Sequence, residues 1–294
     1  MKKYLISLIF LYLFSQEYTA DFEKLGVSAC GTGMGGAMVA LKKDGASFYY
    51  NPSLSALNNQ KEFYFYHSEN FGGQFKTEYF SFTYPKKNLA LGISLYANLI
   101  PNIPYCSLPY PDLPPNDSNN QPILVKNIFA YDLINYYNFS FFKDFWAIGF
   151  NLKFIFRNLG TKKGFGGGAD LGMSLIPSAD ILLGLRIKNI TNSPILWSDK
   201  KREKMKPELA VGISKKFGNF LFAYENEWDY NNFGVEYKIK DLIYLRSGFY
   251  HRSFSFGFGI VYRSLYFDYG YETKKYLESD LPASVIKVSG GIKF

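Results

Sequence analysis

From residue 61 to the C-terminus, apolar and polar side chains alternate in short segments that are separated by turn residues. The segment DFWAIGFNLKFIFR, residues 144–157, shows this pattern most clearly. One set of alternate positions is apolar and mostly aromatic: Trp146, Ile148, Phe150, Leu152, Phe154 and Phe156. The other set is small, polar or charged apart from Ile155, and it ends at Arg157. A period of two is typical of strands with one apolar and one polar face, and it predicts an all-β fold.

The chain contains fourteen segments of this kind, at residues 61–67, 75–84, 87–98, 126–141, 144–157, 166–175, 178–189, 207–216, 218–228, 231–239, 241–250, 253–262, 264–273 and 284–294. Connections after every second segment are tight, whereas the others are mostly longer. An even number of strands with this sorting of loops is typical of a transmembrane antiparallel β-barrel. We therefore predict a barrel of about 14 strands. The alternative is a secreted β-sandwich or a repeat protein.

The composition and the two chain ends support a membrane barrel. Aromatic residues make up 19% of the chain, and such enrichment favours strands and supplies the aromatic girdles of outer-membrane barrels. Lys2 and Lys3 precede an apolar run and a polar stretch that ends at Ala20, which is the layout of a secretory signal peptide. The chain ends on Phe294. A last strand that closes on an aromatic residue resembles the assembly signal of bacterial outer-membrane barrels.

A glycine-rich motif lies before the first predicted strand. It comprises Gly33, Met34, Gly35, Gly36 and Ala37, followed by Asp44, Asn51 and Pro52. This arrangement resembles the N-terminal motif of the FadL-like superfamily of outer-membrane barrels, especially its PorV/PorQ branch. The resemblance implies that the segment folds back as a hatch inside a fourteen-strand barrel. An N-terminal arm that lies against the barrel is the alternative.

The sequence of this segment suits a hatch. Residues without bulk allow close packing inside a lumen, which Gly33, Gly35 and Gly36 provide. Asn51 is predicted as a helix N-cap with Pro52 in the first helical position, and Asp44 is predicted to start a turn. We therefore divide the chain into a signal peptide at residues 1–20, a hatch segment at residues 21–60 and a transmembrane β-barrel at residues 61–294.

The same glycines also match the G-x-G-x-x-G fingerprint of dinucleotide-binding loops, through Gly31, Gly33 and Gly36. That loop requires a buried strand before it and a helix after it, whereas the preceding DFEKLGVSAC is short and half polar. We therefore expect no nucleotide. The two histidines, His67 and His251, are too few for a typical zinc site. No catalytic set emerges, and we expect no enzymatic activity, no metal and no cofactor.

The predicted inward face of the strands carries charges of both signs: Asp132, Arg157, Asp170, Asp180, Arg186, Lys188, Glu208, Glu225, Glu236, Lys238, Arg246, Asp268, Glu272 and Lys287. Mixed signs that face a lumen predict pairing between strands. A selectivity lining is the functional alternative.

Two segments on the long-loop side are candidates for contacts outside the barrel. A proline-rich stretch near residues 99–125 places Tyr105, Leu108, Tyr110 and Leu113 together, which predicts a ligand-capture lid or a protein-docking loop. A basic stretch contains Lys200, Lys201, Arg202 and Lys204, which predicts contact with lipopolysaccharide phosphates. A solvated basic loop is the alternative for the second stretch.

The resemblance implies passive FadL-like transport of hydrophobic small molecules across the bacterial outer membrane. Its alternative is a PorV-like outer-membrane component of type IX protein secretion, with secreted proteins or secretion components as partners. A purely structural barrel is a third hypothesis. The formal net charge is +8 for the whole chain. After export, a basic balance indicates outer-membrane lipid and lipopolysaccharide phosphates, or simply solubility, rather than nucleic acid.

Overall fold

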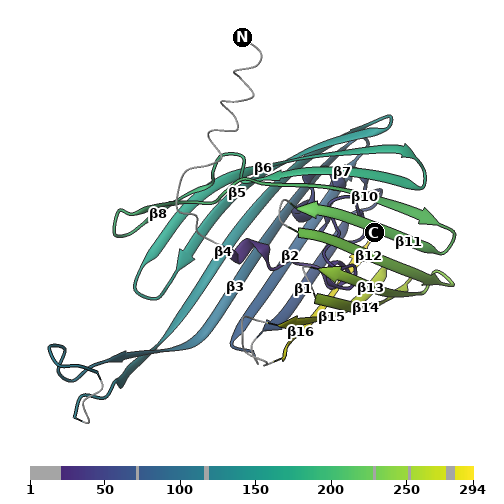
Figure 1. Ribbon diagram of the computed structural model, residues 1–294. Coiled ribbons are helices and arrows are strands. Elements are labelled where there is room, and N and C mark those ends of the chain that lie inside the picture. The colour runs from purple at the N-terminus through teal and green to yellow at the C-terminus, as the bar shows by residue number, and fades with distance from the viewer. Residues whose placement is uncertain (1–20, 71–72, 116–118, 228–229, 251–252, 276–281) are drawn as a thin grey trace.

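The protein is a closed antiparallel β-barrel with a small helical segment in its lumen (Figure 1). The computed structural model describes residues 21–70, 73–115, 119–227, 230–250, 253–275 and 282–294, so the predicted signal peptide lies outside the described residues. Of the sixteen strands in the sheet, β8 and β9 form an added hairpin, and the other fourteen form the ring. Pairing of β1 with β16 and of β5 with β6 completes that ring. The predicted fourteen-strand barrel is confirmed.

The ring consists of β1 (Glu62–Asn70), β2 (Phe75–Lys86), β3 (Leu89–Ser107), β4 (Ile123–Lys143), β5 (Trp146–Asn158), β6 (Lys163–Ser178), β7 (Ile181–Lys188), β10 (Glu208–Phe217), β11 (Phe220–Glu227), β12 (Tyr230–Ile239), β13 (Ile243–Tyr250), β14 (Ser253–Tyr262), β15 (Leu265–Lys275) and β16 (Pro282–Lys293). The added hairpin consists of β8 (Pro194–Trp197) and β9 (Arg202–Lys204). It extends the sheet on β6, beyond the end of β7.

The period-two pattern becomes the two faces of the barrel wall. In β5, Phe154 is 50% exposed on the outside, whereas its neighbours Lys153 and Ile155 are fully buried on the inside. Exposed Phe, Leu and Ile side chains recur on the outside of strands all around the ring. An apolar outer band with a polar lumen is the arrangement that a lipid bilayer requires.

Tight turns define one end of the barrel. Residues with positive φ angles occur in these turns, among them Lys87, Asp144, Gly218 and Arg263. Such angles give a two-residue turn the twist that a hairpin needs. The predicted strand ends are displaced from the observed ones by only a few residues at this end.

The opposite end differs from the prediction in two places. The basic stretch is not a plain loop, because β8 and β9 form within it. The proline-rich stretch also contributes residues to β3 and β4, so that Tyr105 is a strand residue. Pairing of β2 with β3 ends at Leu99, and pairing of β4 with β5 ends at Tyr131. Residues 100–107 and 123–130 therefore form a two-stranded ribbon that projects from the wall (Figure 1), and we call it the ribbon.

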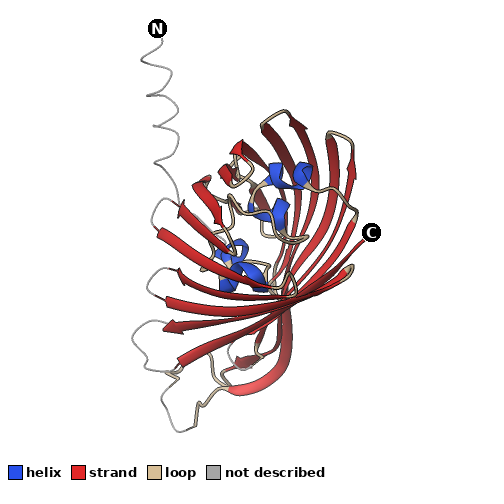
Figure 2. Ribbon diagram, turned by 90° about the vertical axis from the view of Figure 1, so that its right-hand side faces the viewer, coloured by secondary structure: helices blue, strands red, loops and turns tan. Residues whose placement is uncertain are grey.

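Residues 21–60 contain four short helices: η1 (Asp21–Lys24), α2 (Ala29–Gly33), α3 (Ser47–Tyr50) and η2 (Pro52–Leu57). Figure 2 shows these helices inside the curve of the sheet, and we call the whole segment the hatch. Its apolar residues Met34, Met38 and Phe48 are buried with tyrosines of the wall in the main core of the molecule. No helix in the described ranges is long and apolar enough to cross a membrane.

Candidate functional site

Two side-chain caps organise the hatch locally. Ser28 is the N-cap of α2, where its Oγ accepts a hydrogen bond from the Gly31 amide at 2.8 Å. Asn51 is the N-cap of η2, with Pro52 in the first turn, and its Oδ1 accepts from the Ser53 amide at 3.1 Å. The Asn51 side-chain amide also donates to the carbonyl of Val39 at 2.8 Å. The two capping bonds satisfy the helix-end amides of Gly31 and Ser53, which would otherwise be buried without partners.

The glycine motif of the hatch packs against glycines of the wall. A Cβ atom added to Gly248 in β13 would lie 2.1 Å from the amide nitrogen of Gly35. A Cβ atom added to Gly35 would lie 2.4 Å from the carbonyl oxygen of Phe233 in β12. A Cβ atom added to Gly33 would likewise lie 3.1 Å from the Cα atom of Gly257 in β14. The hatch backbone therefore lies directly on the wall backbone, with no room for side chains between them.

The same close approach continues around the lumen. Wall glycines whose Cβ position would fall within 3 Å of the hatch backbone are Gly149, Gly172, Gly184, Gly234, Gly248 and Gly270. They lie on β5, β6, β7, β12, β13 and β15. Glycines that the sequence scatters over distant strands thus provide two groups of close contacts for the hatch, one on β5 to β7 and one on β12 to β15.

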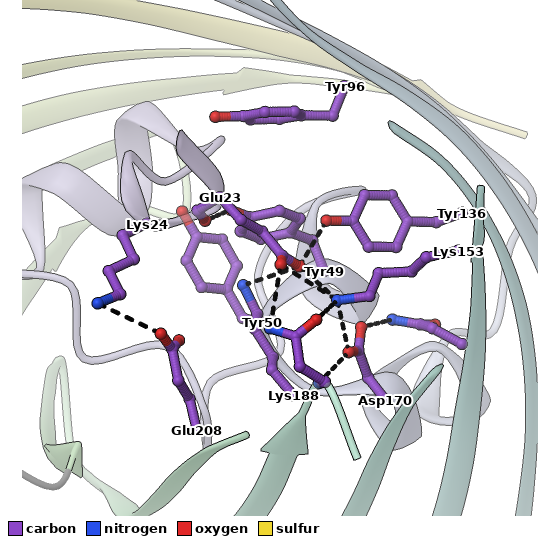
Figure 3. Close-up of polar contacts among 12 residues, drawn as sticks. Glu23, Lys24, Tyr49, Tyr50, Tyr96, Tyr136, Lys153, Asp170, Lys188 and Glu208 are labelled. Carbon is purple, nitrogen blue, oxygen red and sulfur yellow. Dashed lines mark hydrogen bonds and ion pairs between the residues drawn. The ribbon is translucent and has the colours of Figure 1, made fainter. Parts of the chain in front are cut away.

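A buried ionic cluster fixes the start of the hatch (Figure 3). Lys153 of β5 donates to both carboxylate oxygens of Glu23, at 2.9 and 3.1 Å, and lies 2.8 Å from Asp170 of β6. Lys188 of β7 lies 3.8 Å from Glu23, and Tyr136 of β4 donates its hydroxyl to Glu23 at 2.8 Å. Side chains of three wall strands, β4, β5 and β7, therefore contact one hatch carboxylate.

The charge of Glu23 is stabilised by these cations. Burial alone raises the pKa of this carboxyl, but the ammonium groups of Lys153 and Lys188 outweigh burial and lower the pKa to about 2. Lys188 also lies 3.9 Å from the centre of the Tyr49 ring, a cation–π contact with α3. Glu23 and Tyr49 thus connect the hatch to the same group of wall cations.

A second ionic cluster holds the middle of the hatch. Lys43 lies 2.5 Å from Glu236 of β12, and Glu236 accepts from Arg246 of β13 at 2.9 Å. Arg246 in turn donates to Asp268 of β15 at 2.5 Å. Charges of both signs on the lumen face are paired here, as the sequence predicts.

Asp44 lies between the two clusters, and none of the described cations is within ion-pair distance of it. Its carboxylate accepts hydrogen bonds from the Ser28 hydroxyl at 2.5 Å and from the Ala46 amide at 3.1 Å. Burial raises the pKa of Asp44 to about 7, although the Ser28 hydrogen bond acts in the opposite direction. Asp44 is therefore the hatch carboxyl that changes charge near neutral pH.

A cavity of about 550 Å³ remains between the hatch and the wall. Tyr49, Tyr50 and Leu25 of the hatch line it together with Tyr230 and Tyr250 of the wall. Its charged lining residues are Glu23, Glu208, Glu225, Glu227 and Glu272, and Lys24, Arg186, Lys188, Lys206 and Lys287. Five acidic and five basic residues give the described lining no net formal charge. Its volume is within the range of about 300–1,000 Å³ that is typical of small-molecule sites.

The cavity reaches the outer surface of the barrel at the ends of β7 and β10. Leu209 of β10 and Ile190, just after β7, are 38% and 39% exposed, and both also line the cavity. Pairing of these two strands ends at Lys188 and Glu208, where the chain leaves for the β8–β9 hairpin. The pairing of wall strands therefore stops early at this position, where the cavity lining combines these two apolar side chains with the Lys24–Glu208 ion pair at 3.3 Å.

The predicted contact residues lie away from this cavity. Tyr105, Tyr110 and Leu113 are exposed on the ribbon and its loop, and none of them lines the cavity. Asn120 orders that loop, because its side-chain amide donates to the carbonyls of Tyr110, Leu113 and Pro114. The basic residues lie on the β8–β9 hairpin, with Lys200 and Lys201 in its turn and Arg202 and Lys204 in β9.

One sequence prediction about charged residues needs correction. Asp180 does not face the lumen, because β7 begins only at Ile181 and Asp180 is exposed in the turn before it. Lys238 lies in β12 on the same side as Glu236, and it pairs with Asp241 near a tight turn at 2.5 Å. His67 lies 2.7 Å from Glu78, while His251 lies outside the described residues. Within the described ranges, no group of three or more His, Cys, Asp or Glu residues could hold a metal ion.

Sequence reasoning missed the hatch residues that make most of these contacts. Glu23 precedes the recognised motif, and nothing in its local sequence indicates a buried ion pair. Tyr49 and Tyr50 stand directly before Asn51 in the run FYYNP. An apolar aromatic run next to a helix cap is the one signal that could have identified them.

The fold is a fourteen-strand antiparallel barrel whose lumen contains the hatch. No family model matches the chain, and no curated protein is a significant match. Among solved structures, the Pseudomonas putida toluene transporter TodX is similar with a TM-score of 0.60 and 11% identity, over 95% of this chain and 99% of TodX. The CymD monoaromatic hydrocarbon channel matches with a TM-score of 0.60 and 12% identity, over 92% and 98%. A Pseudomonas aeruginosa FadL homologue matches with a TM-score of 0.56 and 12% identity, over 91% and 98%.

Proposed function

We propose that this protein lies in the bacterial outer membrane and passively conducts uncharged hydrophobic small molecules. The observation that carries the proposal is the cavity between hatch and wall, because its lining includes Ile190 and Leu209, which are also exposed near the ends of β7 and β10. Its lining has no net formal charge, so it does not concentrate ions of one sign. The shared fold with the toluene transporter and the hydrocarbon channel supports the same substrate class.

The contacts of the hatch indicate which part of the molecule lets the substrate pass. The hatch backbone lies on the wall glycines, and its ionic clusters are buried, so both contacts resist local displacement. The cavity, in contrast, is bounded by aromatic rings and single side chains that can change rotamer. We infer that the substrate moves past Tyr49, Tyr50 and Leu25 rather than through a fully displaced hatch.

Flux through purified protein in liposomes tests this function. A toluene-sized uncharged probe should cross liposomes that contain the folded barrel faster than empty ones. Leu25→Trp adds bulk inside the cavity and should lower this flux severalfold. Leu159→Trp is the matched control, because Leu159 is exposed in the loop between β5 and β6. A correctly folded barrel that gives no protein-dependent flux would overturn transport as the function.

The ribbon supports a second function, the PorV-like role in type IX secretion. Its residues carry exposed apolar side chains, including Tyr105, Leu124 and Phe129, and among the described residues its strands pair beyond the wall only with each other. Free strand edges next to apolar side chains suit the docking of an extended protein segment. Deletion of the gene from its host distinguishes the two roles. Accumulation of exported proteins in the periplasm, with hydrocarbon uptake unchanged, would show that the function is secretion rather than transport.

A further inference from the structure

Five cations gather where the β8–β9 hairpin meets the loop between β5 and β6. They are Lys162, Lys163, Lys200, Lys201 and Arg202. The Ser198 amide donates to the carbonyl of Lys163 at 2.8 Å, which holds the two segments together. Among the described residues, Asp199 is the one carboxylate that forms an ion pair with any of the five, at 2.5 Å from Lys162. The cluster, which we call the basic patch, therefore keeps a strong positive charge.

The basic patch borders the apolar outer face of the barrel. Strand pairing places Phe156 beside Phe165, Phe165 beside Leu196, and Leu196 beside Arg202, in one row across β5, β6, β8 and β9. Residues directly opposite each other in a sheet face the same side, so Arg202 points outward with the apolar residues. Phe165 and Leu196 are 63% and 59% exposed. A lipid-facing apolar surface thus ends directly at a group of cations.

This arrangement matches the two chemical parts of a lipid. Acyl chains suit the outward Phe165 and Leu196, and anionic headgroup oxygens suit the guanidinium and ammonium groups beside them. The hairpin belongs to the end of the barrel with the long loops, opposite the tight turns. The lipid leaflet at this end is the outer one, if the barrel lies in the outer membrane as proposed above.

We propose that the basic patch binds the phosphate groups of a phosphorylated glycolipid in the outer leaflet. Arg202 contacts a phosphate from the outer face of β9, while Lys200 and Lys201 contact it from the hairpin turn. Lys162 and Lys163 add positive charge from the neighbouring loop. This inference rests on the proposed outer-membrane location but not on transport, since neither the cavity nor the hatch contributes to the patch.

Another role for these cations is protection of a strand edge. Strand β9 is the last strand of the described sheet, and charged residues on an edge discourage pairing with other chains. Reversal of the charges separates the two roles. Glutamate at the same positions still protects the edge, whereas it repels a phosphate.

Titration of the folded barrel in uncharged detergent micelles tests the proposal. The probes are lipid A with two phosphates and the same lipid with its phosphates removed. Each cation near an anionic lipid surface contributes about 1 kcal/mol, or about fivefold in affinity. The wild-type protein should therefore prefer the phosphorylated lipid at least about tenfold, and Lys200→Glu/Lys201→Glu/Arg202→Glu should abolish this preference.

A matched control reverses three exposed lysines near the opposite end of the barrel, Lys143, Lys215 and Lys216. This control carries the same change in net charge and should keep the lipid preference. Equal affinity for both lipids, or equal loss in both triple variants, would overturn the proposal. Displacement of the lipid by an equal concentration of inorganic phosphate would also overturn it, since the site would then bind free phosphate. Unheated gel mobility establishes that each variant is folded, and Arg202→Glu alone serves if the triple variant does not fold.

Discussion

The wall next to the hatch and the ribbon arise from the same kind of alternating sequence, but their surroundings differ completely. In the wall, inward positions include glycines and charged residues that contact the hatch, as Gly248 does with Gly35 and Lys153 with Glu23. In the ribbon, beyond Leu99 and Tyr131, the two strands pair, among the described residues, only with each other. Alternation alone therefore predicts strands, whereas the contacts on each face decide what those strands can do.

The same difference decides how strongly a substitution in each region should change the stability of the barrel. A side chain in the wall has partners on the hatch that cannot relax, so substitutions there remove or overfill a packed contact. A side chain in the ribbon is surrounded mainly by solvent, and substitutions at exposed positions usually change stability by less than about 0.5 kcal/mol. Substitutions in the two regions should therefore separate folding effects from functional ones.

The largest effect is expected from Lys153→Met. Its ammonium group is fully buried between Glu23 and Asp170, so removal leaves two buried carboxylates without their central cation. Loss of one partner of a buried ion pair typically costs about 3–5 kcal/mol in the free energy of unfolding. Urea unfolding of the detergent-solubilised barrel measures this change. Lys162→Met is the control, because its partner Asp199 is on the surface, and exposed pairs contribute about 0–1 kcal/mol. Equal losses in the two variants would contradict the distinction between wall and periphery.

A smaller loss is expected from Gly35→Val. The added side chain would meet the backbone of Phe233 and Phe249, and Gly35 also has a φ angle of +61°. Overpacking of this kind typically costs about 1–3 kcal/mol, and it should displace the hatch from its seat. Protease protection of residues 21–60 in the folded barrel measures that displacement.

Gly218→Val is the matched control for this substitution. Gly218 has a similar φ angle of +58°, but a Cβ there would have no heavy atom within 4 Å. Both variants therefore carry the same backbone strain, and only Gly35→Val carries the steric conflict. If Gly218→Val exposed the hatch to protease as much as Gly35→Val, close packing would not explain the glycine motif.

A third expectation concerns pH and Asp44. Because burial raises the pKa of Asp44 from 3.8 to about 7, its contribution to hatch stability is complete below pH 3.8 and is lost as the pH rises through 7. Between pH 6 and 8, the hatch should lose about 1.4 kcal/mol of protection against hydrogen exchange. Asp44→Asn should weaken this dependence, because an amide does not ionise. The low pKa of Glu23 affects stability only when the pH falls from 4.5 towards 2, so Glu23 does not contribute between pH 6 and 8. An unchanged pH profile in Asp44→Asn would exclude this carboxyl as its source.

The sequence predicted the barrel well because each wall strand carries its own evidence. Trp146 to Arg157 alternate with period two, and this local pattern is enough to assign β5 and its two faces. Contacts between distant segments leave no such local trace. Nothing near Glu23 indicates Lys153, which is 130 positions away, and nothing near Gly248 indicates Gly35.

In the proline-rich stretch, by contrast, a local sequence signal predicts a structure that the chain does not adopt. Pro101 and Pro104 predict a loop, since proline lacks a donor for strand pairing. Beyond the wall, however, the outer edge of β3 has no neighbour among the described strands, so that donor is not required, and the strand continues to Ser107. Sequence alone does not state where a neighbouring strand ends.

The smallest effect on stability is expected in the ribbon loop, where Leu108→Ser, Tyr110→Ser and Leu113→Ser are combined. Tyr110 and Leu113 are 57% and 47% exposed, so barrel assembly and the urea midpoint should be nearly unchanged. If these residues capture a hydrophobic substrate, the apolar surface that they bury with it contributes ~25 cal/mol per Å² to binding. The serine substitutions remove this contribution, so uptake by intact cells should fall. Flux in liposomes under saturating probe should stay normal, because the cavity is intact.

The same variant distinguishes capture from protein docking. If the ribbon receives exported proteins, the triple change should leave probe uptake untouched and cause exported proteins to accumulate in the periplasm. Leu159→Ser, in the exposed loop between β5 and β6, is the control for a general loss of surface hydrophobicity. An unfolding midpoint that falls in the triple variant as far as in Lys153→Met would show that the ribbon supports the barrel after all. The contrast between a packed wall and an independent ribbon would then be wrong.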